Sequence, residues 1–225
     1  MDISGIDYLG LDRVLKRGTG EVIEEHELAM FVYDSVSEAY FLACADPALG
    51  AEILERHRDR DYHALMVSDH GLGLKAYERY GFEALLECYQ GAYYGGIPEI
   101  PETGLVIREA EEKDLPFLNA TYEYTTPEEM RQLVEHGRVL LGFEDGQPVG
   151  LIGEHLEGSM GLLHILPQYR RKGYAEALEK AMIAKTLGEG LIPFGQVQKD
   201  NQASLGLQSK LGMTMSKNLI CWMWR

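Results

Sequence analysis

A basic glycine turn between an apolar strand and an amphipathic helix constrains this chain more than any other feature. It lies within residues 163–178, which read LHILPQYRRKGYAEAL. An apolar run ends at Pro167, three cations follow, and Leu178, Met182 and Ile183 then recur at helical spacing. The first amide hydrogens of a helix lack partners within the helix and lie at the positive end of its dipole. The pattern therefore predicts a phosphate cradle.

The residue types in this turn fit such a cradle. Gly173 lets a phosphate approach the backbone closely, and Ala175 keeps the following turn small. Arg170, Arg171 and Lys172 would add compensating positive charge. The alternative interpretation is an ordinary solvated helix start, since basic residues are common there.

The distribution of charge favours a small anion as the ligand. The net charge is −15, which disfavours nucleic acids and anionic membranes as partners. Residues 165–225 nevertheless hold 9 Lys and Arg against 4 Asp and Glu, a balance of +5. The remaining 12 basic and 32 acidic residues give residues 1–164 a balance of −20. A basic segment in an acidic chain suits a compact, highly charged ligand.

The chain is predicted to contain two domains. Glycines and prolines at residues 97–104 indicate a linker, so we expect one domain over residues 1–96 and another over residues 105–225. Three widely spaced cysteines, with no metal-binding spacing, predict neither a metal site nor disulfides. We find no pattern of a signal peptide or a membrane span, and expect a cytoplasmic protein.

The order of predicted elements indicates an α/β layered fold. Residues 105–225 alternate strands and helices, with a hairpin turn at Asp145-Gly146 and a helix N-cap at Thr126. A strand is expected over residues 160–166 and a final strand over residues 214–224. Residues 47–90 repeat this alternation of helix and strand.

Residues 105–225 resemble the GNAT superfamily of acyl-CoA-dependent N-acyltransferases. Arg170, Gly173 and Ala175 meet the signature (Q/R)xxGx(G/A), and residues 107–115 and 199–213 resemble the opening and later segments of that fold. Residues 166–170 and 192–194 are most similar to the glycine N-acyltransferase-like branch. The resemblance implies a mixed, mostly antiparallel sheet flanked by helices, preceded by a smaller, degenerate GNAT-like domain.

The resemblance also assigns a binding role to several residues. Main-chain groups of Ile165 and Leu166 would pair with the pantetheine arm. The diphosphate of acetyl-CoA or another acyl-CoA would lie on the turn that comprises Arg170, Arg171, Lys172, Gly173, Tyr174 and Ala175. Asn201 would contact the pantetheine, and Asn is equally suited to cap a helix.

The expected acid–base residues are missing from this sequence. Ser159 stands where the resembled branch has a glutamate base, so Glu157 and Glu154 become the candidate substitutes. Gln208 stands where many members have a tyrosine that donates a proton to the leaving thiolate.

We therefore expect transfer of an acetyl or other short acyl group to a primary amine, with a small molecule such as an amino acid as acceptor. The alternative is a coenzyme-A-binding or sensing protein that has lost its acid–base pair. The sequence sets neither the acyl length nor the oligomeric state.

Overall fold

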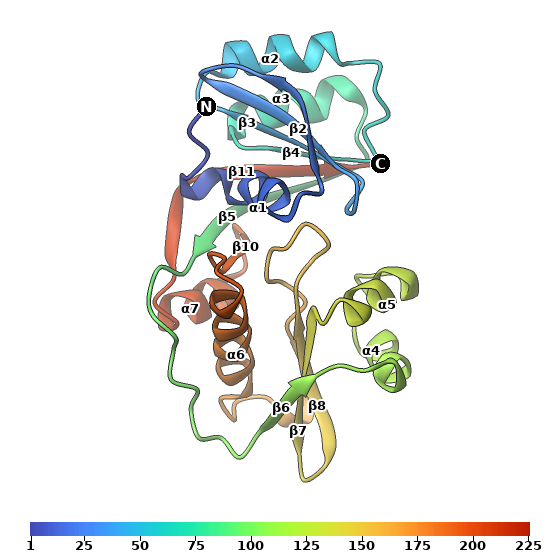
Figure 1. Ribbon diagram of the computed structural model, residues 1–225, viewed down its shortest axis with the longest axis vertical. Helices are drawn as coiled ribbons and strands as arrows, with labels where there is room; N and C mark the ends of the chain where they lie inside the picture. Colours follow the sequence, from blue (N-terminus) through green and yellow to red (C-terminus); the bar gives the residue numbers. More distant parts are fainter. The chain divides into compact units, whose positions relative to one another are not determined.

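A computed structural model describes residues 1–225 as two compact units. It contains a seven-stranded sheet in the order β1-β2-β3-β4-β11-β5-β10 and a four-stranded sheet in the order β6-β7-β8-β9. Helices flank both sheets, as Figure 1 shows, and this confirms the predicted mixed α/β layers. Unit 1 comprises Met1–Ala92, Gln196–Gly206 and Thr214–Arg225, and unit 2 comprises Tyr93–Gly195 and Leu207–Met213.

Unit 1 is built on the seven-stranded sheet. β3 and β4 are parallel, whereas β1-β2, β2-β3, β4-β11 and β11-β5 are antiparallel pairs. Its elements are the 3-10 helix Ile6–Tyr8, α1 (Leu9–Arg17), β1 (Gly20–Glu25), β2 (Ala29–Asp34), β3 (Ala39–Cys44), α2 (Pro47–Arg56), β4 (Ala64–Val67), α3 (His70–Tyr80), β5 (Ala84–Ala92) and β11 (Thr214–Trp224). β10 (Phe194–Gln198) and α7 (Gln202–Lys210) each have residues in both units.

Hydrophobic side chains cover both faces of this sheet. Phe31 and Leu42 belong to the core that includes residues of α2 and α3, whereas the adjacent Val32 and Phe41 belong to the core that includes Leu11 of α1. Successive side chains of a strand point to opposite faces, so these strands are apolar throughout rather than alternating.

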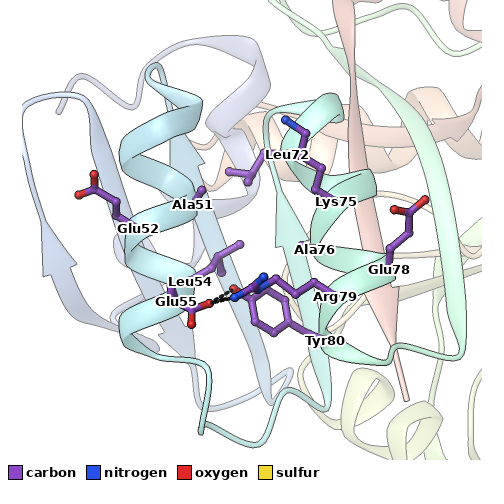
Figure 2. A pocket seen from close by; sticks show the side chains of 10 residues that line it. All are labelled: Ala51, Glu52, Leu54, Glu55, Leu72, Lys75, Ala76, Glu78, Arg79 and Tyr80. Carbon is purple, nitrogen blue, oxygen red and sulfur yellow. Dashed lines mark hydrogen bonds and ion pairs between the residues drawn. The ribbon is translucent and has the colours of Figure 1, made fainter.

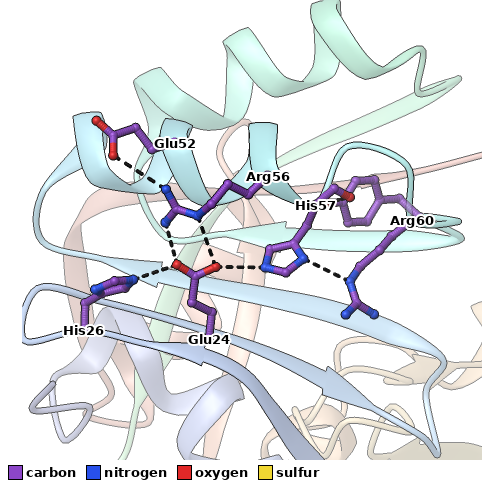
Figure 3. Close-up of polar contacts among 7 residues, drawn as sticks. Glu24, His26, Glu52, Arg56, His57 and Arg60 are labelled. Atoms are coloured by element: carbon purple, nitrogen blue, oxygen red, sulfur yellow. Dashed lines mark hydrogen bonds and ion pairs between the residues drawn. The ribbon is translucent and has the colours of Figure 1, made fainter.

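A polar network joins the edge strand β1 to α2, as Figure 3 shows. Arg56 donates to Glu24 at 2.5 Å, and this contact is the main reason that the pKa of Glu24 falls to about 2. The Nε of Arg60 donates to Nδ1 of His57 at 3.3 Å. Nε2 of His57 therefore carries the proton that it donates to Glu24, at 2.8 Å.

Unit 2 is built on the four-stranded sheet, in which neighbouring strands are antiparallel. Figure 1 shows α4 and α5 on one side of this sheet and α6 on the other. Its elements are β6 (Val106–Glu109), the 3-10 helix Glu112–Asp114, α4 (Leu115–Thr121), α5 (Pro127–Glu135), β7 (Val139–Glu144), β8 (Gln147–Gly153), β9 (His164–Ile165), the 3-10 helix Pro167–Tyr169 and α6 (Tyr174–Gly188).

Two predicted local signals in unit 2 are confirmed. Thr126 accepts a hydrogen bond from the amide of Glu129, whose side chain accepts from the amide of Thr126, so α5 begins with a capping box. Asp145 and Gly146 both have positive φ, 48° and 77°, as a two-residue hairpin between β7 and β8 requires.

None of the helices combines the length and the apolar character that a membrane span needs.

The last strand lies in a different sheet from the one that its position in the sequence suggested. β11 lies within the predicted second domain, residues 105–225, yet it pairs with β4 and β5 of unit 1. Its Ile220 and Trp222 belong to one core of that unit, and Cys221 and Met223 belong to the other. When a strand is apolar on both faces, its sequence does not indicate which sheet it joins.

The close contact between α3 and β11 gives a test of this pairing. A methyl group at Gly73 of α3 would lie 2.5 Å from Cβ of Cys221, whereas one at Gly71 would have no neighbour closer than 3.5 Å. We expect Gly73→Ala to destabilise the fold by roughly 1–3 kcal/mol through overpacking. The matched variant Gly71→Ala should leave stability unchanged or raise it by up to about 1 kcal/mol. Equal unfolding midpoints in urea would contradict this packing.

Candidate functional site

The first turn of α6 presents open amide groups. Its N-cap, Gly173, has φ of +83° and no side chain with which to cap the helix. The first α-helical bond of this turn runs from the amide of Ala177 to the carbonyl oxygen of Gly173, at 3.1 Å. The amides of Tyr174, Ala175 and Glu176 come before it, so the helix leaves these donors for an external acceptor. A helix start at this position agrees with the sequence prediction, whereas phosphate binding there stays a prediction.

The start of α2 in unit 1 is closed by a side chain. Asp46, its N-cap, accepts from the amides of Ala48 at 2.9 Å and of Leu49 at 3.4 Å. A carboxylate thus occupies the place where an anionic ligand would bind, and its charge would repel a phosphate. Two similar helix starts therefore differ in whether they can accept an anion.

The three cations of the turn have different partners. Nε of Arg170 donates to the carbonyl oxygen of Ile165 at 3.0 Å. Lys172 forms an ion pair with Glu144 at 2.8 Å, and this contact lowers the pKa of Glu144. The hydroxyl of Tyr174 also donates to Glu144. Arg171 is exposed, with φ of +66°.

The strand before the turn has an open edge. β9 is the last strand of its sheet and pairs only with β8 there. The amide of Leu166 donates to the carbonyl oxygen of Val149 at 2.9 Å, so Leu166 faces β8. Ile165 is one residue earlier, and because successive main-chain groups of a strand alternate between its two edges, its N–H and C=O face away from β8. The N–H of Ile165 can therefore pair with an extended ligand, whereas its carbonyl oxygen accepts from Arg170 and the N–H of Leu166 is engaged.

The strand predicted over residues 160–166 is interrupted. Met160 forms isolated bridges with Glu154 and Gly195, and its amide donates to the carbonyl oxygen of Phe194 at 2.7 Å. The chain then leaves the strand conformation, and β9 includes only His164 and Ile165. The apolar pattern did not reveal this break.

The structure brings two of the three predicted catalytic residues together. The hydroxyl of Ser159 donates to Glu157. Two backbone bonds of 2.8 Å close the loop around them, from the amide of His155 to Ser159 and from the amide of Gly158 to His155. Glu157 is 7% exposed and Ser159 is fully buried.

Glu154 belongs to a different network. It is 1% exposed, accepts from Thr186 of α6 at 3.4 Å and lies 3.6 Å from Arg138. Arg138 in turn forms a 2.7 Å ion pair with Glu189. These contacts fix the far end of α6, which suits a structural role for Glu154.

Asn201 has the capping role that the sequence offered as one of two interpretations. Its side-chain oxygen accepts from the amide of Ser204 at 3.1 Å, at the start of α7. A contact with pantetheine stays a prediction. No three His, Cys, Asp or Glu residues gather to form a metal site.

A hollow of about 720 Å³ lies between α2 and α3 of unit 1, as Figure 2 shows. Leu54 and Leu72 contribute apolar surface, and Arg79 donates to Glu55 at 2.7 Å beside them. None of the predicted site residues lines it.

The sequence analysis missed a buried carboxyl group in α6. Glu179 is 4% exposed and accepts a hydrogen bond of 2.6 Å from the side chain of Gln208 in α7. Its Oε2 is buried and has no hydrogen-bond partner. Burial raises its pKa from 4.5 to about 7. The sequence did contain a signal, because Glu179 lies four residues before Ile183 and therefore on the same helix face as the predicted apolar stripe.

This carboxyl group makes stability depend on pH. The unfolded chain loses the proton at about pH 4.5 and the folded chain at about pH 7, so stability falls as pH rises through that window. Above pH 7, the difference between the two pKa values lowers the free energy of unfolding by roughly 3 kcal/mol. Glu179→Gln should therefore unfold at a higher denaturant concentration than the wild type at pH 8, and at a similar one at pH 4.

Glu176→Gln is the matched control. Glu176 lies on the same helix, but Lys210 and Lys180 lower its pKa, so this variant should not gain stability between pH 4 and pH 8. The same pH response in both variants would contradict the burial of Glu179.

Comparisons with known proteins bear on the family and the fold of this chain. The family model of the acetyltransferase (GNAT) family matches residues 105–213. A solved structure of a Drosophila protein shares 15% identity at a TM-score of 0.76, covering 99% of this chain and 91% of its own. A GCN5-related N-acetyltransferase-like protein from Streptococcus suis shares 18% identity at a TM-score of 0.57, covering 95% and 93%.

A tandem GNAT protein from the clavulanic acid biosynthesis pathway shares 13% identity at a TM-score of 0.50, covering 87% of this chain and 78% of its own. No curated protein matches the sequence. At these identities the solved structures establish the fold alone. The chain therefore has the GNAT fold, and its residues 105–213 match the acetyltransferase family of that name.

Proposed function

We propose that this protein transfers an acetyl or other short acyl group from acyl-CoA to a primary amine of a small molecule. One observation carries the proposal: open helix amides at residues 174–176 follow directly after an open strand edge at Ile165. The amides would hold the diphosphate, and the strand edge would pair with the pantetheine arm. Arg171 is exposed beside them and would add charge.

Arg170 and Lys172 would join the ligand by exchanging partners. Arg170 donates a hydrogen bond to the carbonyl oxygen of Ile165, and Lys172 forms an ion pair with Glu144. A diphosphate offers both cations stronger, doubly charged acceptors. The cost of releasing Glu144 would reduce the affinity for coenzyme A.

Glu157 is our candidate for the group that removes a proton from the amine. It lies in the tight loop before Met160, and Ser159 orients its carboxylate. The nucleophile must be a neutral amine, so a carboxylate that accepts its proton directly or through water would promote attack on the thioester. Holding amine and thioester side by side would supply much of the remaining acceleration.

The acceptor is proposed from charge and resemblance. The net charge of −15 would attract a cationic amine. The similarity of residues 166–170 and 192–194 to the glycine N-acyltransferase-like branch favours an amino acid.

Unit 1 is proposed to be a GNAT-like unit that no longer binds coenzyme A. Its parallel strands stay paired to their ends: Leu42 pairs with Val67, and the amide of Ser68 donates to the carbonyl oxygen of Leu42 at 3.0 Å. The hydroxyl of Ser68 then accepts from the amide of Cys44 at 3.0 Å. No strand edge is open between them, and Asp46 closes the helix start.

A coenzyme-A sensor without catalysis is the second candidate. Gln208 stands at the position of the expected proton donor, and its side-chain amide donates a hydrogen bond to Glu179. An amide does not release a proton as an acid does, so this position has no general acid of its own. Release of free thiol from acetyl-CoA over a panel of primary amines separates the two. Turnover supports the enzyme, and binding of acetyl-CoA without turnover supports the sensor.

Gly173→Asp tests the diphosphate site. The substitution places a carboxylate at the open amides, in a backbone conformation that costs a non-glycine residue about 1–3 kcal/mol. We expect acetyl-CoA binding, measured by isothermal titration, to fall at least 100-fold. Gly190→Asp is the control, because Gly190 has a similar φ of +73° beyond the other end of α6. Equal affinities in the two variants would place the diphosphate elsewhere.

Glu157→Gln tests the base. The variant should lose about 10²–10⁴-fold in kcat while its affinity for acetyl-CoA stays within twofold of the wild type. Glu154→Gln should lower the unfolding temperature and reduce kcat less, because it weakens the contacts of Glu154 with Thr186 and Arg138. A kcat for Glu157→Gln that equals the wild-type value would remove Glu157 from the mechanism.

A further inference from the structure

Glu179 is a buried acid that the proposed mechanism has not used. Its side chain lies between α6 and α7, with one oxygen held by Gln208 and the other without a donor. A buried acceptor without a partner is costly, so such groups commonly serve a function. Binding a proton removes the charge of this carboxyl group, and a polar group of a ligand would supply the hydrogen bond that Oε2 lacks.

No neighbouring cation neutralises this carboxyl group. Burial raises its pKa, and the hydrogen bond from Gln208 opposes that rise. The charged side chains nearest to it along α6 and α7 pair with each other, since Lys180 and Lys210 both contact Glu176, at 3.0 and 2.5 Å. Near neutral pH, therefore, no cation on α6 or α7 holds Glu179 in its charged form.

The position of Glu179 along α6 matches the path of the proposed ligand. α6 begins at the phosphate turn, and Thr186 near its end contacts Glu154, so the helix runs back alongside residues 154–165. Tyr174 and Glu179 are five residues apart, which corresponds to about 7.5 Å along the helix axis. Glu179 thus lies between the level of the diphosphate and the level of Glu154.

We propose that Glu179 donates the proton that the leaving thiolate of coenzyme A takes up, and that Gln208 holds its carboxyl group in position. The proposal rests on the proposed acyltransfer function. Glu179 would replace the side-chain donor that the resemblance leads us to expect at residue 208. The observations that support this role are the burial of Glu179, its hydrogen bond from Gln208 and its unpartnered Oε2.

Glu157 and Glu179 together account for every proton that moves in the reaction. The amine attacks the thioester carbonyl and loses a proton to Glu157 as the C–N bond forms. The C–S bond breaks, and the O–H proton of Glu179 moves to sulfur, which leaves a free thiol and a carboxylate at residue 179. Transfer of the proton on Glu157 to Glu179 through solvent restores both groups.

The test measures kcat and KM against pH for wild type, Glu179→Gln and Lys210→Gln. The wild type should lose activity as pH rises above about 7, because Glu179 is then ionised. Glu179→Gln should lower kcat at pH 6 by about 10–100-fold, leave KM for acetyl-CoA within twofold, and abolish this fall of activity with pH. Lys210→Gln removes the other polar contact between α6 and α7 and should keep the fall.

The outcomes separate this inference from the proposed function. A wild type that releases no thiol with any amine overturns both. An active wild type whose Glu179→Gln variant keeps its kcat and its loss of activity above pH 7 overturns the role of Glu179 alone. A variant that folds less stably and has a raised KM, with the pH dependence intact, shows a merely structural residue and also overturns the inference.

Discussion

The absence of a side-chain cap at the start of α6 is the constraint on which the proposed chemistry depends. Every helix begins with amide hydrogens that its own carbonyl groups cannot satisfy. α2 and α3 meet this need with Asp46 and Asp69, which accept from amides of their first turns. At α6 the corresponding residue is Gly173, so an outside acceptor can take those hydrogen bonds.

The two units differ at a strand edge and at a helix start. In unit 1, β3 and β4 pair along their length, and Ser68 adds a side-chain bond to Cys44 at their ends. In unit 2, Met160 bridges to Gly195 and the chain then leaves the strand, so that β9 forms an edge. An open edge and an open helix start occur together in unit 2 and are both closed in unit 1. This pattern is what a retained ligand site in one unit and a lost one in the other would produce.

The local structure of unit 2 could be predicted because each signal acts over a few residues. Thr126, Asp145-Gly146 and Gly173 determine a cap, a hairpin and a helix start through their own backbone preferences. The pairing of β11 could not be predicted in this way, since it depends on partners more than a hundred residues away. β2 and β3 were also not predicted, because apolar residues on both faces of these strands leave no alternating pattern.

In the candidate site, too, local features could be predicted and long-range contacts could not. The phosphate turn could be found from its residue types, because glycine and basic residues at a helix start act locally. Glu179 and Gln208 are 29 residues apart in sequence, and nothing in the residues between them indicates their contact. The pairing of Lys172 with Glu144 is likewise a product of the fold.

Amide hydrogen exchange with and without acetyl-CoA tests the central claim most directly, because it reports on the main-chain groups themselves. The account predicts slower exchange at Ile165, Tyr174 and Ala175 when the ligand is bound, with no change at Ala48 and Leu49, which Asp46 already holds. Protection at the start of α2, or none at the start of α6, would contradict it.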